Sequence, residues 1–284
     1  MDDAVHTARA MWTLFEPVHA MTYFAPEARA EYVRAGLRGF WRGYFAGRVA
    51  PLGKTGAAAV TAAFCSFAPS MTGRAIPGVW DLITPADALA RRLAGASAAL
   101  RPLLAGLESQ VETSARLLRQ ATGELDCTGR VLGAANAALP WPDEPLERLW
   151  HAATVLREHR GDGHVAALVA ADIDGAEALV LRCGLDQRRE DMQPNRGWTD
   201  EQWQDAQGRL EARGWVDRDG RATAAGAQAY RAVEDATDHA AARPWLLLGS
   251  ADLAALRQAL TPLARACAAI LPYPSPIGVP APVV

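Results

Sequence analysis

Alanine, leucine and arginine dominate this 284-residue chain, and runs of β-branched residues are scarce. These three residues are among those that lose least on entering an α-helix, whereas β-strands are rich in β-branched and aromatic residues. The chain is 50% hydrophobic and 21% charged, so it has enough apolar surface to build a core. The sequence therefore predicts a mostly α fold, and each assignment below starts from that expectation.

The first part of the chain divides into helical stretches at its prolines and glycines. Apolar residues recur there at intervals of three to four, which is the period of an amphipathic helix. Thr84, followed by proline and then by Asp87, is a strong helix start, because threonine caps free N–H groups and proline suits the first turn. The predicted helices in this part cover residues 5–20, 27–46, 57–70 and 85–120.

A turn-rich stretch over residues 122–145 marks a predicted domain boundary. We expect an N-terminal helical domain over residues 1–125 and a second domain over residues 140–284. Capping boxes at 174–177 and 199–202 predict two helix starts in the second domain. The predicted helices there cover residues 146–160, 164–172, 176–183, 200–213, 224–242 and 250–270, ahead of a proline-rich tail.

Residues 209–230, RLEARGWVDRDGRATAAGAQAY, have the order of a winged-helix domain. A helix ends in a step from Leu210 to Trp215, a short hairpin is predicted around Asp219 and Gly220, and a new helix starts at Thr223. This order resembles the MarR-like winged-helix proteins. The resemblance implies a winged-helix second domain with a short β-hairpin wing.

The whole chain is also similar to an actinobacterial family of helix-turn-helix domain proteins. The stretches that carry this similarity are EPVHAMTYFAPEAR, GLRGFWRGYFAGRVAPLG, LWHAATVLREHRGDGHVAAL and YPSPIGVP. The similarity extends over the full length and implies a helix-turn-helix fold and a regulator. It transfers no individual site residue to this chain.

The charge of the chain disfavours DNA as a partner. The net charge is −3, whereas nucleic-acid binders usually carry a basic surface. A recognition helix in the major groove needs basic and polar side chains. The predicted helix over residues 200–213 instead has more acidic than basic residues: Asp200, Glu201, Asp205 and Glu211 against Arg209 and Arg213.

No cofactor, metal or membrane motif is visible in the sequence. The four cysteines are scattered without a CxxC pair, and neither a GxGxxG nor a Walker motif occurs. We therefore expect no cofactor and assign no metal. The N-terminus is acidic where a signal peptide is positively charged, and no apolar run approaches the roughly 18 residues of a membrane span. We expect a cytoplasmic protein with no membrane partner.

The stretch LREHRGDGHVAAL is the first candidate site. Its two glycines predict a tight turn, with His159 ending one helix, Asp162 capping the next and His164 in the first turn of that helix. The helix dipole disfavours a cationic histidine at a helix N-terminus, so His164 is expected to be neutral and suited to act as a base. Two interpretations stay open: an ordinary helical corner, and a catalytic pocket formed by His164, His159 and Asp162.

Glu16 and His19 form the second candidate site, because residues three apart on a helix share a face. One ExxH pair is half of a carboxylate-bridged metal site, and the sequence has no second pair. We assign Glu16 to catalysis and His19 to ligand binding. The alternatives are that Glu16 pairs with an arginine, and that both join His159 and His164 around a single metal ion.

The stretch GLRGFWRGYFAGR is the third candidate site. Arg38, Trp41, Arg42 and Tyr44 alternate cationic and aromatic side chains at helical spacing. Such a pattern suits a pocket for an anionic aromatic ligand, and it equally suits a packing helix whose arginine stems cover apolar surface. We assign these four residues to ligand binding.

Two functions therefore stay open. In the first, the chain binds a small molecule between its domains, and catalysis stays open: if the chain is an enzyme, we expect cofactor-independent acid–base chemistry of the isomerase, cyclase or lyase type in specialised metabolism. In the second, it is a MarR-like dimeric transcriptional regulator, and the same pocket holds its effector. The acidic recognition helix favours the first function, and the resemblance favours the second.

Overall fold

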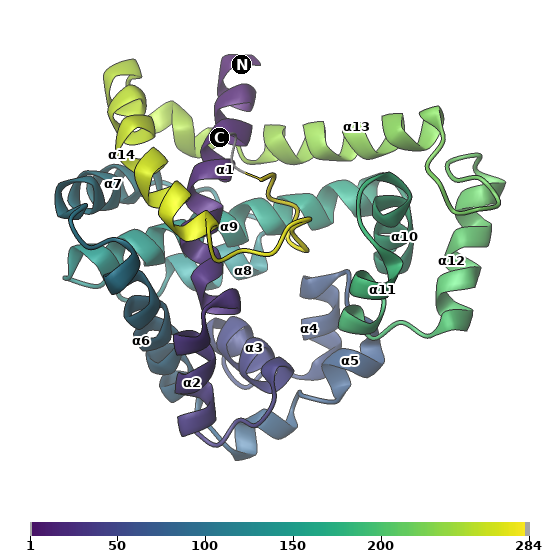
Figure 1. The fold of residues 1–284 in the computed structure, drawn as a ribbon, viewed down its shortest axis with the longest axis horizontal. Helices are drawn as coiled ribbons and strands as arrows, with labels where there is room; N and C mark the ends of the chain where they lie inside the picture. Colours follow the sequence, from purple (N-terminus) through teal and green to yellow (C-terminus); the bar gives the residue numbers. More distant parts are fainter. Residues whose placement is uncertain (1, 282–284) are drawn as a thin grey trace.

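The computed structural model describes residues 2–281 and confirms the mostly α expectation (Figure 1). The first half of the chain forms eight of the fourteen α-helices found in this range. They are α1 (Asp2–Phe24), α2 (Pro26–Arg34), α3 (Phe40–Val49), α4 (Ala57–Phe64), α5 (Pro69–Gly73), α6 (Pro85–Leu103), α7 (Glu108–Ala121) and α8 (Val131–Ala137). The other six are α9 (Pro145–Ala170), α10 (Gly175–Leu185), α11 (Arg189–Met192), α12 (Asp200–Ala212), α13 (Ala224–Ala240) and α14 (Ser250–Ala268).

Two predicted long helices are each divided in two by glycines. The predicted helix over 27–46 becomes α2 and α3 because Gly36 and Gly39 adopt φ values of 84° and 85°. The predicted helix over 85–120 becomes α6 and α7, with Gly106 at a φ of 84° between them. A positive φ is open to glycine and interrupts a right-handed helix. The start at Thr84 is confirmed, because its side chain accepts a hydrogen bond from the Asp87 N–H.

The predicted turn at Arg160–Gly163 is wrong, because residues 145–170 form the single helix α9. Gly163 is needed here for close packing: a Cβ atom on it would lie 2.7 Å from Nη1 of Arg130 and 3.0 Å from Cβ of Ala240 in α13. A Cβ on Gly161 would make only ordinary contacts, the nearest at 3.7 Å. The two glycines therefore do not break the helix, and one of them lets a neighbouring helix approach.

The predicted role of Asp162 as an N-cap of its own helix is also wrong. Its side chain accepts a 2.7 Å hydrogen bond from the backbone N–H of Gly133, in the first turn of α8. The N–H groups of a first helical turn lack partners within the helix, so a carboxylate from another helix satisfies one of them. Asp162 thus fastens α8 to the middle of α9.

The capping boxes at Asp174 and Thr199 are confirmed as the starts of α10 and α12. The expected β-hairpin wing is reduced to a tight turn with one bridge: within residues 2–281 the only β pairing joins Val216 to Ala222, with one backbone hydrogen bond across the turn on each side of it. The N–H of Arg221 is bonded to the side chain of Asp217, and the N–H of Trp215 is bonded to the Leu210 carbonyl. The backbone donors that would extend a ladder are therefore already used.

Helix α9 lies at the centre of the molecule, with α13 running alongside it (Figure 1). It also packs against α1, α6, α7 and α8. The largest apolar core combines residues of α1, α6 and α7 with residues of α9 and α14, and so joins helices from both sides of the proposed boundary. A smaller apolar core, separate from the largest one, holds α10 and α12 together.

The chain segment after α14 turns back across the molecule toward α10 (Figure 1, yellow). Its residue Val279 is buried in the main core. Gln187 and Arg196 donate hydrogen bonds to the carbonyls of Ser275 and Pro276. The segment is thereby held against the second half of the chain. No helix in the described range is both long and apolar enough to cross a membrane.

Candidate functional site

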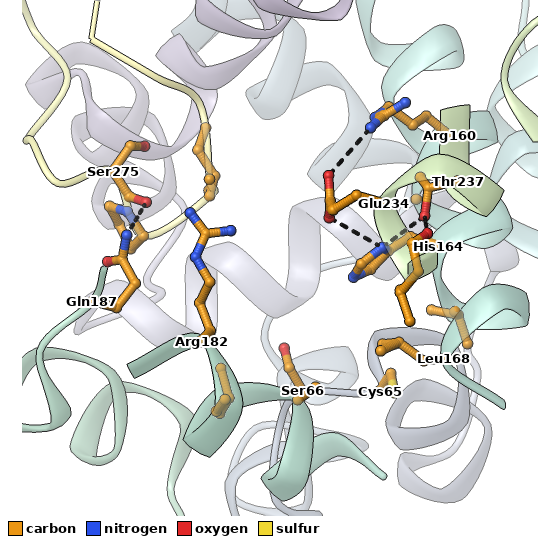
Figure 2. Close-up of a pocket in the computed structure, with 18 of the residues that line it drawn as sticks. Cys65, Ser66, Arg160, His164, Leu168, Arg182, Gln187, Glu234, Thr237 and Ser275 are labelled. Carbon is orange, nitrogen blue, oxygen red and sulfur yellow. Dashed lines mark hydrogen bonds and ion pairs between the residues drawn. The ribbon is translucent and has the colours of Figure 1, made fainter. Parts of the chain in front are cut away.

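A cavity of about 700 Å³ lies beside the centre of α9 (Figure 2). Residues of α1, α3, α4, α9, α10 and α13 line it, together with residues 275–278 and 280 of the C-terminal segment. Its lining includes the aromatic side chains of Trp12, Tyr44, Phe64, Phe67 and Tyr230. Its size is that of a site for a small organic molecule, for which about 300–1,000 Å³ is typical.

His164 extends from α9 toward this cavity and is held from α13 (Figure 2). Its Nδ1 atom lies 3.0 Å from the hydroxyl of Thr237 and 3.8 Å from a carboxylate oxygen of Glu234. Burial lowers the pKa of His164, and the charges of nearby arginines lower it further, although Glu234 raises it. The expected neutral state of His164 therefore has a different cause from the one the sequence indicated, because the residue is in the interior of α9.

Glu16 lines the same cavity from α1. The indole N–H of Trp12 donates a 3.2 Å hydrogen bond to its carboxylate, and Arg157 lies 3.6 Å away. Burial raises the pKa of Glu16, the charge of Arg157 opposes this, and the charge of Glu158 adds to it. The structure thus brings together two of the predicted catalytic residues, Glu16 and His164, from distant parts of the chain.

Arg48 and Glu158 form a buried ion pair at the edge of the cavity. Two guanidinium nitrogens of Arg48 lie 2.9 and 3.0 Å from the two carboxylate oxygens of Glu158. Arg157 donates a further 2.8 Å hydrogen bond to Glu158. Burial alone would raise the pKa of Glu158, but the charges of Arg157 and Arg48 outweigh it and hold that pKa well below its usual range.

Arg196 differs from these arginines because it has no carboxylate partner in the described part of the chain. Its guanidinium donates only to the carbonyls of Asn195 and Pro276, both at 3.3 Å, and its Nε is buried without an acceptor. The guanidinium lies over the ring of Phe67, 4.8 Å from the centroid. Burial lowers the pKa of Arg196, and Arg48 and Arg157 lower it further by repulsion.

The other two histidines of the candidate list, His19 and His159, do not line the cavity. Nε2 of His159 lies 3.3 Å from the carbonyl of Asp126, and burial with the nearby charge of Arg130 lowers the pKa of His159 to about 4. His19 is buried with both ring nitrogens engaged, one with Thr154 and one with Tyr23, each at 3.0 Å. Both therefore behave as core histidines.

Four residues in or just before α3 are predicted from the sequence to bind a ligand: Arg38, Trp41, Arg42 and Tyr44. Of these, only Tyr44 lines the cavity. Arg38 and Arg42 are exposed, and Trp41 packs on the core around Phe45. Of the residues in the alternating pattern, the structure therefore places only Tyr44 at the cavity. Arg48, at the end of the same stretch, is the arginine that reaches the cavity.

The arrangement does not form a metal centre. The described residues contain no group of three or more histidine, cysteine, aspartate or glutamate side chains that could hold a metal ion. Glu16, His19, His159 and His164 each have separate partners. The most important residues that the sequence did not indicate are Arg196, Glu234 and Thr237, because nothing in the local pattern places them beside α9.

Comparison with known proteins adds one finding. A family model described as a helix-turn-helix family matches residues 8–273, which is most of the chain. No curated protein and no solved structure matches the chain.

Proposed function

The chain belongs to the helix-turn-helix family, and we propose that it binds an anionic small molecule with an aromatic or apolar body in the cavity beside α9. The observation that carries this proposal is the unpaired guanidinium of Arg196. A buried charge without a counter-ion is costly, and an anionic ligand would relieve that cost. Guanidinium groups are well suited to this task because their N–H donors match a carboxylate or phosphate in pairs.

The charge balance of the cavity supports an anion. Counting Glu158 and Asp238, each of which pairs with two of the arginines from behind, the cavity has seven arginines and six acidic residues. The arginines are Arg9, Arg48, Arg157, Arg160, Arg182, Arg196 and Arg231, and the acids in the lining are Glu16, Asp186, Glu234 and Asp235. The excess is positive in a place where water is partly excluded, so a negative ligand is attracted more strongly than at the surface.

The aromatic lining supports the second part of the proposal. Arg48 lies over Phe64 at 4.1 Å from the ring centroid, and Arg182 lies over Tyr230 at 5.2 Å. The edges of both guanidinium groups already donate hydrogen bonds within the protein, Arg48 to Glu158 and Arg182 to Asp186, so these stacked pairs offer a ligand flat and apolar surface rather than free donors. A molecule with a flat apolar body and a carboxylate, sulfonate or phosphate group matches both features.

Binding of the fluorescent anion anilinonaphthalene sulfonate tests this proposal. Arg196→Gln removes the unpaired charge and should weaken binding about 10- to 100-fold, the loss expected for one charged hydrogen-bonding group. Arg42→Gln is the matched control, because Arg42 is exposed and outside the cavity. Equal affinities for the wild type and Arg196→Gln, or equal losses in both variants, would contradict the proposal.

A second function, a MarR-like dimeric transcriptional regulator with this cavity as its effector site, is favoured by the family match and by the α10–α12 pair. The charges on α12 oppose it. Its acidic residues Asp200, Glu201, Asp205 and Glu211 are exposed. Arg209 already pairs with Asp174 and Glu177, so it is not free to contact phosphate.

Fluorescence anisotropy with the DNA upstream of the chain's own coding region, across a salt series, separates the two functions. We expect affinity no higher than for random DNA of the same length. Tight and sequence-selective binding that weakens steeply with salt would establish the regulator instead, because such a slope reports displaced counter-ions from phosphate contacts.

A further inference from the structure

The hydrogen bonds around His164 define which ring nitrogen carries a proton. Thr237 has one hydroxyl hydrogen, and its Oγ1 donates it to the carbonyl of Val233 at 2.7 Å. The same oxygen lies 3.0 Å from Nδ1 of His164, so it accepts a hydrogen bond there. Nδ1 therefore carries the hydrogen, and in the neutral ring Nε2 carries the free lone pair.

That lone pair borders the cavity. Nε2 of His164 has no hydrogen-bond partner among residues 2–281, whereas His19 uses both of its ring nitrogens. The side chain is 36% exposed even though it is deep inside the molecule, because it borders the open volume (Figure 2). The basic atom is thus accessible to a bound molecule while the opposite side of the ring is held by Thr237.

The charged groups around His164 favour the neutral imidazole before proton transfer, and one of them stabilises the imidazolium that forms when the ring takes up a proton. Arg9, Arg160 and Arg182 approach from α1, α9 and α10 and lower the pKa of His164, which burial lowers first. Glu234 of α13 raises it. Glu234 lies 3.8 Å from Nδ1, on the side away from the lone pair, where it stabilises an imidazolium as it forms.

We propose that His164 is a general base that removes a proton from the molecule bound in the cavity, so that the cavity catalyses a cofactor-free proton transfer. This inference rests on the proposed function, because it needs a molecule bound beside Nε2. The substrate class is an anionic molecule with an acidic C–H bond next to a carbonyl or imine group.

The step balances without a cofactor. The C–H bond breaks, its proton moves to Nε2, and its electron pair stays on the substrate as an enolate-type anion beside the cavity arginines. Return of the same proton to a different atom completes an isomerisation. No electron leaves the substrate, and the imidazole regains its lone pair.

The test uses nitrobenzisoxazole, a flat aromatic probe that a base opens by removing one C–H proton. The N–O bond breaks as the C≡N bond forms, and the phenolate product is an absorbing anion. We expect the wild type to open the probe with a rate that rises with pH through a single midpoint below 6.5, the value of an ordinary histidine. His164→Asn keeps a donor for Thr237 but has no basic atom, and should lower the rate roughly 100-fold and remove the midpoint.

The controls separate this inference from the proposed function. His239→Gln, at an exposed histidine of α13, should keep the wild-type rate. Anilinonaphthalene sulfonate should still bind His164→Asn, because Arg196, the group proposed to hold the sulfonate, is unchanged in this variant. If the sulfonate binds the wild type but probe opening is absent, or is unchanged in His164→Asn, the general base is wrong and the binding function stands. If the sulfonate does not bind the wild type, the binding function itself is wrong, and this inference fails with it.

Discussion

Burial lowers the pKa of each of His19, His151, His159 and His164. These histidines differ instead in which of their ring nitrogens have hydrogen-bond partners. His19 has partners on both nitrogens, and His159 donates to a backbone carbonyl away from the cavity. His164 keeps one nitrogen unbonded at the cavity. Residue type and burial are therefore not enough to identify a base; its second hydrogen bond also matters.

Buried neutral histidines make stability depend on pH, and His159 gives the clearest case. Its pKa falls from 6.5 to about 4 on folding, so the unfolded state binds the proton more readily. The contribution to stability is complete above pH 6.5 and is lost as the pH falls toward 4. His159→Gln keeps a donor for Asp126 and should reduce this acid-induced loss by about 3 kcal/mol.

Urea unfolding at pH 7 and at pH 4.5 measures the difference, with His239→Gln as the surface control. The pKa of Asp162, which burial raises to about 6, acts in the opposite direction and is the same in all three proteins. An unchanged pH dependence in His159→Gln would show that this imidazole is not buried as described.

At the scale of the element, α9 organises the site. It contributes His164 to the cavity on one face, and on another it receives the side chain of Arg130, which donates to the His159 carbonyl. A turn at residues 160–163 would separate His164 from Arg157 and Glu158. The continuity of this helix therefore places His164 and the buried ion pairs on the same helix beside the cavity.

The two glycines of α9 offer a matched test of that continuity. Gly163→Ala should destabilise the protein, because the added methyl would lie within 3.0 Å of Arg130 and α13. Gly161→Ala should stabilise it by about 1 kcal/mol, because alanine favours a helix and its methyl meets no close neighbour. Thermal and urea unfolding of both variants measure the effects. Destabilisation by Gly161→Ala would indicate a turn there.

At the scale of the molecule, one core connects the two halves. Leu117 of α7, in the first half, is fully buried in a cluster that also contains Leu149 and Leu260 of α9 and α14. The cavity depends on the same connection, because α1 contributes Glu16 and α9 contributes His164. A site that needs both halves is formed only when that shared core is intact.

Leu117→Ala tests whether this core is shared. The substitution should cost about 2–5 kcal/mol, as for other buried leucines. Hydrogen–deuterium exchange should then rise in α9 and α14 as well as in α7. Leu210→Ala, in the separate core of α10 and α12, is the matched control and should leave α7 protected. Faster exchange confined to residues 1–125 would instead support two independent domains.

The sequence by itself determined the features that depend on neighbours along the chain. Helical composition predicted the fold class, and the boxes at Asp174 and Thr199 located two helix starts, because a cap is satisfied within four residues. It also named Glu16 and His164. Only the tertiary structure decided that Gly163 packs against another helix and that Arg196 lacks a counter-ion at the cavity. Each of these depends on atoms brought together from distant positions in the chain, and local spacing carries no information about them.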